Sequence, residues 1–228
     1  MSERPIDPSP GPSAAIPWRR VIAPLTVMLV IVAGLSALLL GPKAHTTPGG
    51  GQEVKSAAGG FDGTLAIPVR SAPPLHLRNY LGQEVSLSQY KGKAVLVTFL
   101  YTNCPDICPL ITSNLRVALN MLGRRAADAQ VIAVSVDPRG DTPKAVARFL
   151  SEHEMTGRMQ YLIGSAGELS SAWKAWGVGS KREVGQPNLV AHSALVYGID
   201  AAGKVRTIYP DSFRPAEIAH DVPKLAGS

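Results

Sequence analysis

The chain has 228 residues, of which 45% are hydrophobic and 18% are charged. This balance excludes both a largely disordered protein and a membrane protein with many spans. Two cysteines are too few for a disulfide-rich scaffold or a four-cysteine zinc site. The net charge is +6, but the basic residues are spread along the chain without a long run, so we expect no nucleic-acid partner.

The N-terminal part of the chain predicts a membrane anchor between two unfolded segments. Residues 1–20 are rich in proline and serine and are expected to be a disordered cytoplasmic N-terminus. Residues 21–40 carry no charge, and about 20 apolar residues are enough to cross a bilayer core. A cleaved signal peptide is the alternative, but its apolar core is shorter, and residues 41–44 make a poor cleavage site. Residues 41–60 are rich in glycine and are expected to be a flexible tether.

The charged residues beside the apolar run predict its orientation. Arg19 and Arg20 precede it, whereas only Lys43 lies close behind it, and basic flanks stay on the cytoplasmic side. We therefore expect a single-pass protein of the bacterial cytoplasmic membrane, with its C-terminal domain on the periplasmic side. The Arg19-Arg20 pair could also belong to a twin-arginine export signal, which the neighbouring residues support poorly.

Residues 61–228 are expected to form one folded domain with an alternating order of strands and helices. Ala94–Tyr101 and Gln130–Val136 are continuous apolar runs, typical of strands buried on both faces. Apolar residues recur every three or four positions from Ile111 to Leu122, which predicts a helix that ends at Gly123. The other predicted elements are a hairpin within Leu75–Leu87, a helix that begins at Asp141-Thr142-Pro143, a strand over Leu189–Tyr197, a turn over Asp200–Gly203, a strand over Val205–Tyr209 and a helix over Pro215–Leu225.

The order of these elements predicts an α/β domain with a thioredoxin-like fold. In such a fold a strand, a helix, a second strand and a second helix are followed by a hairpin and a last helix. Trp173 and Trp176 are expected to pack in the core or on the surface rather than to form a site.

Both cysteines lie in the segment TNCPDICP, residues 102–109, where the first buried strand is followed by its helix. The spacing of Cys104 and Cys108 allows both sulfurs to lie on one side of a first helical turn. A helix N-terminus stabilises thiolates, so we expect two sulfurs of low pKa. Three residues separate the cysteines, not the two that are usual in dithiol oxidoreductases. A stabilising disulfide in an oxidising compartment is the structural alternative.

Two thiolates and one imidazole suit copper, as Cu(I) or Cu(II), better than zinc, which takes a fourth ligand. His192 lies at the start of a late core strand, and in a thioredoxin-like fold the loop before that strand faces the cysteine loop. His192 could therefore be a ligand, or it could cap or pack. His153 shares the apolar face of its helix and is expected to pack. The remaining histidines are His45 in the tether, His76 in the hairpin and His220 near the C-terminus.

These residues resemble the Sco/SenC family of copper-binding proteins. The matching segments are TNCPDICP (102–109), SVDP (135–138) with DTP (141–143), and His192-Ser193. The resemblance implies that Cys104, Cys108 and His192 bind copper for delivery to the binuclear copper centre of cytochrome c oxidase during assembly. Family members usually carry an acidic residue before the histidine, where this chain has Ala191. That departure could alter partner docking or copper retention, but it removes no ligand.

The leading hypothesis is a membrane-anchored copper metallochaperone that receives copper from a donor protein and passes it to the oxidase subunit. The alternative is a thiol–disulfide oxidoreductase in which Cys104 attacks and Cys108 resolves, so that both would be catalytic. A peroxidase-like reductase with Cys104 as the peroxidatic thiolate is a third hypothesis, but the sequence identifies no pocket that activates peroxide. Asp137 is expected to support the cysteine loop, and Asp106 to cap the helix or face a partner.

Overall fold

The strand β4 (Ala94–Leu100) lies at the centre of the structure. The structure is a computed structural model that describes residues 60–182 and 190–227. Every residue of β4 is buried. The strand pairs in parallel with β5 (Ala129–Ser135) and in antiparallel fashion with β9 (Leu195–Ile199). A strand with neighbours on both sides and layers on both faces needs a continuous apolar run, which explains its sequence AVLVTFL.

The strands of the described residues form one mixed sheet of eight strands and a separate two-stranded ribbon. The order in the large sheet is β1-β10-β9-β4-β5-β6-β2-β3, and β7 pairs only with β8 in the ribbon. The parallel part, β4-β5-β6, carries the cysteine loop at its carboxyl edge. The other strands are β1 (Thr64–Ser71), β2 (His76–Asn79), β3 (Glu84–Ser86), β6 (Met159–Ile163), β7 (Ser180–Arg182), β8 (Val190–His192) and β10 (Lys204–Pro210).

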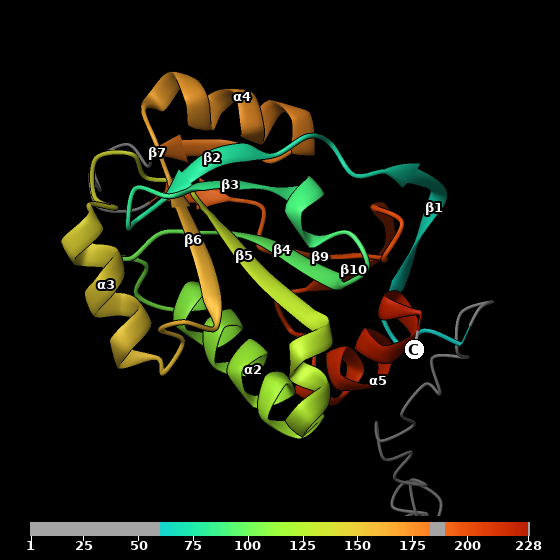
Figure 1. Cartoon of the computed structure of the whole chain (residues 1–228). Helices are drawn as coiled ribbons and strands as arrows, with labels where there is room; N and C mark the ends of the chain where they lie inside the picture. Colours follow the sequence, from blue (N-terminus) through green and yellow to red (C-terminus); the bar gives the residue numbers. More distant parts are fainter. Residues whose placement is uncertain (1–59, 183–189, 228) are drawn as a thin grey trace, which may run out of the picture. The chain divides into compact units, whose positions relative to one another are not determined.

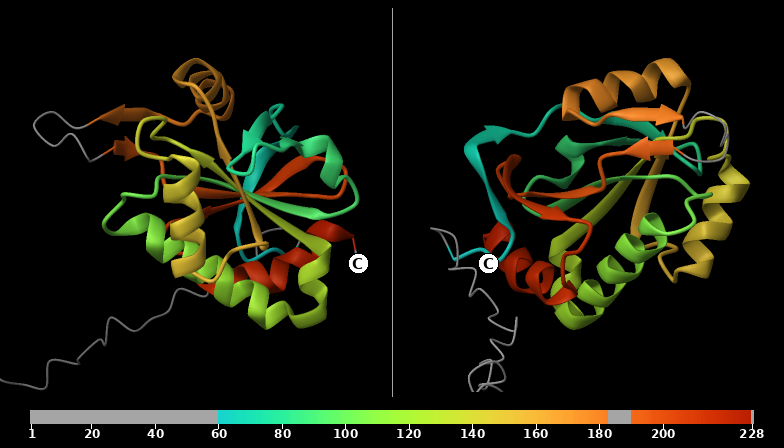
Figure 2. Two further views of the ribbon diagram at one scale, coloured as in Figure 1. Left: turned by 60° about the vertical axis from the view of Figure 1, so that its left-hand side comes forward. Right: turned by 180° about the vertical axis from the view of Figure 1, so that it is seen from behind.

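Helices cover both faces of the sheet (Figure 1, Figure 2). The helices α2 (Ile107–Leu122), α3 (Pro143–Glu152) and α5 (Pro215–Ala226) share one face, and α4 (Ala166–Trp176) lies on the other. The short 3-10 helices are η1 (Leu87–Tyr90) and η2 (Gly123–Asp128). This three-layer arrangement buries the central strands from both sides, as expected for parallel strands joined by helices.

Aromatic side chains fill the layer between β4 and α4. The ring of Phe99 lies 5.9 Å from the ring of Trp176 and 6.3 Å from that of Tyr197, centroid to centroid. Trp176 and Tyr197 are in turn 5.2 Å apart at an interplanar angle of 70°. Tilted and edge-on contacts of this kind add to the burial of large apolar area. The expectation that Trp173 and Trp176 are packing residues agrees with this, since Trp176 is buried and the Trp173 indole donates to the Ser135 carbonyl.

Most of the predicted elements are confirmed, and their ends follow from local chemistry. The helix α2 ends at Gly123, whose φ of 55° lies in the left-handed region that favours glycine. The helix α3 begins after Thr142, whose hydroxyl accepts a hydrogen bond from the Ala145 amide, with Pro143 at the first helical position. The α/β class and the sheet–helix order agree with the predicted thioredoxin-like arrangement.

One predicted strand is wrong in its extent. The segment Leu189–Tyr197 is not a single core strand, because β8 ends at His192 and pairs with β7, and the core strand β9 begins only at Leu195. His192 therefore lies on a ribbon beside the sheet rather than at the mouth of a core strand. No element was predicted at β1, β6, β7 or α4, although the start of α4 is indicated by the capping box of Ser165 and Glu168.

Within the described ranges, no helix is long and apolar enough to cross a bilayer. The anchor predicted for residues 21–40 lies outside those ranges, as do the N-terminal segment, the tether up to residue 59 and His45. These remain predictions from the sequence.

The glycine at position 198 supplies a test of the sheet's packing. Gly198 lies between Leu96 of β4 and Thr207 of β10, and an added Cβ would overlap the Thr207 hydroxyl. We expect Gly198→Ala to lower the free energy of unfolding by about 1–3 kcal/mol, because buried overpacking displaces neighbours. Gly167→Ala is the matched control, since its added Cβ has no neighbour within 4 Å. In that exposed first turn of α4 alanine should be neutral or stabilising by up to about 1 kcal/mol. Urea unfolding measures both, and equal losses would contradict this packing.

Candidate functional site

The two cysteines lie where β4 is followed by α2. Cys104 is in the connecting loop, and Cys108 is the second residue of the helix, which begins at Ile107. The Cys108 amide donates to Cys104 Sγ at 3.3 Å, and the Cys104 amide donates to the Tyr101 carbonyl at 3.3 Å. Cys108 is fully buried and Cys104 is 8% exposed. The predicted position in the first helical turn is therefore correct for Cys108 only. Cys104 precedes the helix, but its sulfur accepts a hydrogen bond from an amide at the helix N-terminus.

The ribbon β7–β8 brings His192 to the cysteines. The ring atom Nε2 of His192 lies 3.7 Å from Cys108 Sγ, and Nδ1 lies 3.2 Å from the carbonyl oxygen of Ser193. A carbonyl can only accept, so Nδ1 carries the proton and donates it, and the Nε2 lone pair is directed to the sulfur. Burial lowers the pKa of His192, which keeps the ring neutral. The structure thus brings the three predicted ligands together; their role as ligands remains a prediction.

Tyr101 joins the histidine to the cysteine loop, and no sequence pattern had indicated it as a site residue. Its ring lies 5.8 Å from the His192 ring in an edge-on contact at 83°. Its hydroxyl accepts a hydrogen bond from the Val190 amide at 3.4 Å, at the start of β8. Burial raises the pKa of Tyr101 to about 12, so the hydroxyl stays neutral. The ribbon is therefore fixed to the end of β4 by a ring contact and a hydrogen bond.

The two sulfurs have opposite electrostatic character. A hydrogen bond from the Cys108 thiol lowers the pKa of Cys104 to about 5 against the opposing effect of burial, and the amides of Asp106 and Cys108 add to the lowering. The pKa of Cys108 is raised, first by that same hydrogen bond, then by burial and by the negative charge of Cys104. The expectation of two low-pKa sulfurs is wrong, because two adjacent buried sulfurs share one negative charge. The free site holds one thiolate and one thiol.

A buried carboxylate behind the loop, Asp141, was not singled out from the sequence as a site residue. Its Oδ1 accepts the Thr102 amide at 2.8 Å. Its Oδ2 accepts the hydroxyls of Ser135 at 2.6 Å and Tyr161 at 3.0 Å. Burial raises the pKa of Asp141, and the hydrogen bonds from Ser135 and Thr102 oppose that shift. The signal was present in the segment SVDPRGDTP, where a second acidic residue follows the end of a buried strand.

The two acidic residues named from the sequence lie close to the cysteines with different roles. Asp137 is buried at the end of β5, where its amide donates to the Ser135 hydroxyl at 3.1 Å and its carboxylate accepts the Arg139 amide at 3.2 Å. This position agrees with a supporting role. Asp106 occupies the N-cap position of α2, but its side chain makes no capping hydrogen bond and is exposed. The expected side-chain cap is therefore not formed, and the role of facing a partner stays a prediction.

The other described histidines lie in other surroundings. His153 packs its ring 4.5 Å from that of Phe149, as expected for a packing residue. His76 is exposed beside Glu84. His220 bonds to Asp221 at 2.9 Å on α5.

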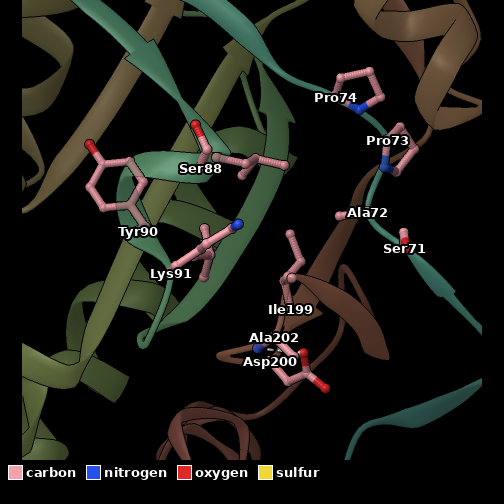
Figure 3. A pocket seen from close by; sticks show the side chains of 13 residues that line it. Ser71, Ala72, Pro73, Pro74, Ser88, Tyr90, Lys91, Ile199, Asp200 and Ala202 are labelled. Atoms are coloured by element: carbon pink, nitrogen blue, oxygen red, sulfur yellow. Dashed lines mark hydrogen bonds between the residues drawn. The ribbon is translucent and has the colours of Figure 1, made fainter.

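A cavity of about 250 Å³ lies at the end of the sheet opposite to the cysteines (Figure 3). It is lined by Val95 at the start of β4 and Ile199 at the end of β9, whereas the cysteines follow the end of β4. Its acidic side chain, Asp200, already accepts the amides of Ala202 and Lys204. The cavity is thus separate from the cysteine site.

The lowered pKa of Cys104 predicts its reactivity. Cys104 should already be almost entirely thiolate at about pH 6.5, so its rate of alkylation by iodoacetamide should hardly change up to about pH 8. The alkylation rate of an ordinary thiol rises about tenfold per pH unit below its pKa. In Cys108→Ala the thiol donor is lost, so the pKa of Cys104 should rise and its alkylation rate should become pH-dependent. Peptide mass spectrometry of quenched samples measures both rates. A tenfold rise per pH unit at Cys104 in the unmodified protein would contradict the shared-proton geometry.

A family model described as SCO1/SenC matches residues 68–227, which contain all three candidate ligands. The SCO1 protein homolog of Bacillus subtilis is 30% identical over 139 residues, which are 60% of this chain and 72% of the relative.

Two solved structures resemble this chain in fold and are 27% and 28% identical to it in sequence. Bradyrhizobium japonicum ScoI with copper bound is 28% identical with a TM-score of 0.62, over 68% of this chain and 99% of that chain. BsSco, described as a member of the Sco family of cytochrome c oxidase assembly proteins with a disulfide switch, is 27% identical with a TM-score of 0.60. That match covers 72% of this chain and 98% of BsSco. By the extent of the family match and the agreement of fold, this chain belongs to the SCO1/SenC family.

Proposed function

We propose that this protein binds copper through Cys104, Cys108 and His192 and delivers it to the binuclear copper centre of cytochrome c oxidase during assembly. The observation that carries the proposal is the 3.7 Å separation of His192 Nε2 and Cys108 Sγ. A trigonal metal ion with bonds of about 2.0 Å to nitrogen and 2.3 Å to sulfur holds these atoms about 3.7 Å apart. The imidazole and the thiol therefore already stand at ligand spacing.

The chemistry of the donor set supports copper over harder cations. Two sulfurs and a neutral imidazole are soft donors, and three of them suit Cu(I) or a small Cu(II) site. The hydrogen bond from His192 Nδ1 to the Ser193 carbonyl fixes the ring in the orientation that a metal-binding histidine needs. Because Cys104 is a thiolate at neutral pH, only the Cys108 proton has to leave when copper enters.

The position of the site supports transfer to a partner. Cys104 retains 8% exposure and His192 is partly exposed at the edge of the sheet. Three protein donors leave a coordination position open, so an incoming thiolate of the acceptor can bind before the old bonds break. Copper is thus a cargo in this proposal, taken from a donor protein and released to a subunit of the oxidase.

A membrane anchor at residues 21–40 is part of the same proposal. A single span would hold the domain on the periplasmic side, close to a membrane-embedded acceptor, and raise the effective concentration of the two proteins.

A second function is favoured by the unequal pKa values of the cysteines. A thiolate at Cys104 can attack one sulfur of a partner disulfide. A mixed disulfide between Cys104 and that sulfur forms, and the other partner sulfur leaves as a thiolate. Cys108 then loses its proton and attacks Cys104 Sγ, which releases the second partner thiol. In the balanced reaction the chain's dithiol becomes a disulfide, and the partner's disulfide gains two electrons and two protons. This thiol–disulfide exchange would prepare cysteines of a copper site for metal.

The imidazole provides the test of copper binding. We expect the purified reduced protein to bind one Cu(I) per chain. Substitution of a residue that only supports the ligands typically lowers metal affinity by about 10–100-fold, and His192→Ala should lower it by more, because it removes a ligand. His153→Ala is the control, because that ring packs against Phe149 and should leave copper binding unchanged. Competition with a chromophoric Cu(I) chelator measures all three proteins. Equal affinity of His192→Ala and the unsubstituted protein would contradict the proposal.

The same variant separates the two functions in cells. His192→Ala keeps both cysteines, so it should still exchange disulfides but not support assembly of the oxidase copper centre. If oxidase activity survives in His192→Ala and is lost in Cys104→Ser, the oxidoreductase function replaces the copper-delivery function.

A further inference from the structure

The side chain of Asp141 links three segments that come from distant parts of the chain. It is 4% exposed. One oxygen accepts the Thr102 amide at the start of the cysteine loop, and the other accepts the hydroxyls of Ser135 at the end of β5 and Tyr161 in β6. A carboxylate that receives three donors in a buried place is strongly held, because each lost partner would leave an unpaired polar group.

This link lies just beyond the paired residues of β4 and β5, which end at Leu100 and Ser135. Directly after the ends of β4 and β5, the Val136 amide donates to the Leu100 carbonyl at 2.9 Å. Beyond it the two segments leave the sheet, and the Thr102 amide has the Asp141 carboxylate as its acceptor. Asp141 is itself fixed by its amide, which donates to the Asp137 carbonyl at 3.0 Å. The carboxylate therefore joins Thr102, two residues beyond the end of β4, to the loop that follows β5.

We propose that Asp141 is a positioning residue of the dithiol: through the Thr102 amide it holds the cysteine loop against β5 and β6, so that Cys104 Sγ stays beside Cys108. Thr102 is two residues before Cys104, so release of its amide frees the loop at its root. Preorganised sulfurs close both a copper chelate and a disulfide more favourably than free ones. The copper part of this proposal rests on the proposed function, and the disulfide part does not.

The chain contains a matched control for a buried carboxylate. Asp221 on α5 is fully buried and accepts the amides of Asp62 at 2.8 Å and Gly63 at 2.9 Å and the hydroxyl of Tyr209 at 2.8 Å. These partners belong to the N-terminal end of the domain and to β10, not to the cysteine loop. Asp141→Ala and Asp221→Ala thus remove the same type of group, a buried carboxylate with several hydrogen-bond donors, from two different places.

Two readouts test the proposal. The first is Cu(I) affinity by chelator competition. The second is the equilibrium with glutathione, in which the dithiol gives two electrons and two protons to oxidised glutathione and yields two reduced glutathione molecules. We expect Asp141→Ala to lower Cu(I) affinity by about 10–100-fold. We expect it to disfavour the disulfide by about tenfold, equal to about 30 mV. Asp221→Ala should leave both within about threefold of the unsubstituted protein, as expected for a site without shared partners.

The outcomes separate the possibilities. The proposal is overturned if folded Asp141→Ala leaves both readouts unchanged, or if Asp221→Ala shifts them equally. If Asp141→Ala does not fold, Asp141→Leu and Asp221→Leu decide it, because they remove every acceptor and keep the branched shape of the side chain. A glutathione shift above about threefold in the first variant alone supports positioning, and any other result refutes it. If the unsubstituted protein binds no copper, the proposed function fails, while the glutathione equilibrium still tests Asp141.

Discussion

The proton shared between two buried sulfurs is the interaction on which the site depends. Cys108 is fully buried and next to Cys104, so two negative charges there would repel each other without water to screen them. The hydrogen bond from Cys108 to Cys104 resolves this by leaving one thiolate and one thiol. The neutral imidazole of His192 then faces the protonated sulfur. Replacement of that single proton by Cu(I) would leave the net charge of the two sulfurs and the cation unchanged and would engage all three donors at once.

The fold serves to bring three segments to one edge of the sheet. The loop after β4 carries the cysteines, the loop after β5 carries Asp141, and the ribbon beside β9 carries His192. Helices cover both faces of the sheet (Figure 2), and loops on such a scaffold can hold functional groups in fixed positions. Tyr101 and Asp141 help to connect these segments, since one reaches the ribbon and the other reaches β5 and β6.

The sequence predicts what depends on neighbours in the chain and fails where partners are distant. The apolar run of β4, the helix end at Gly123 and the Thr142-Pro143 start are local signals, and the structure confirms them. The cysteine motif and its resemblance led to His192. By contrast, the partners of Asp141 lie 39 and 20 positions away at Thr102 and Tyr161, which no local pattern shows. The raised pKa of Cys108 depends on burial and on the charge beside it, so spacing alone suggested two equal sulfurs.

In the proposed function, two sulfurs and one imidazole nitrogen of this chain bind one copper ion. X-ray absorption spectroscopy of the Cu(I)-loaded protein tests it directly. The account predicts a coordination shell of two sulfurs at about 2.3 Å and one imidazole nitrogen at about 2.0 Å. A shell of nitrogen and oxygen atoms alone, with both cysteines still open to alkylation in the loaded protein, would contradict it.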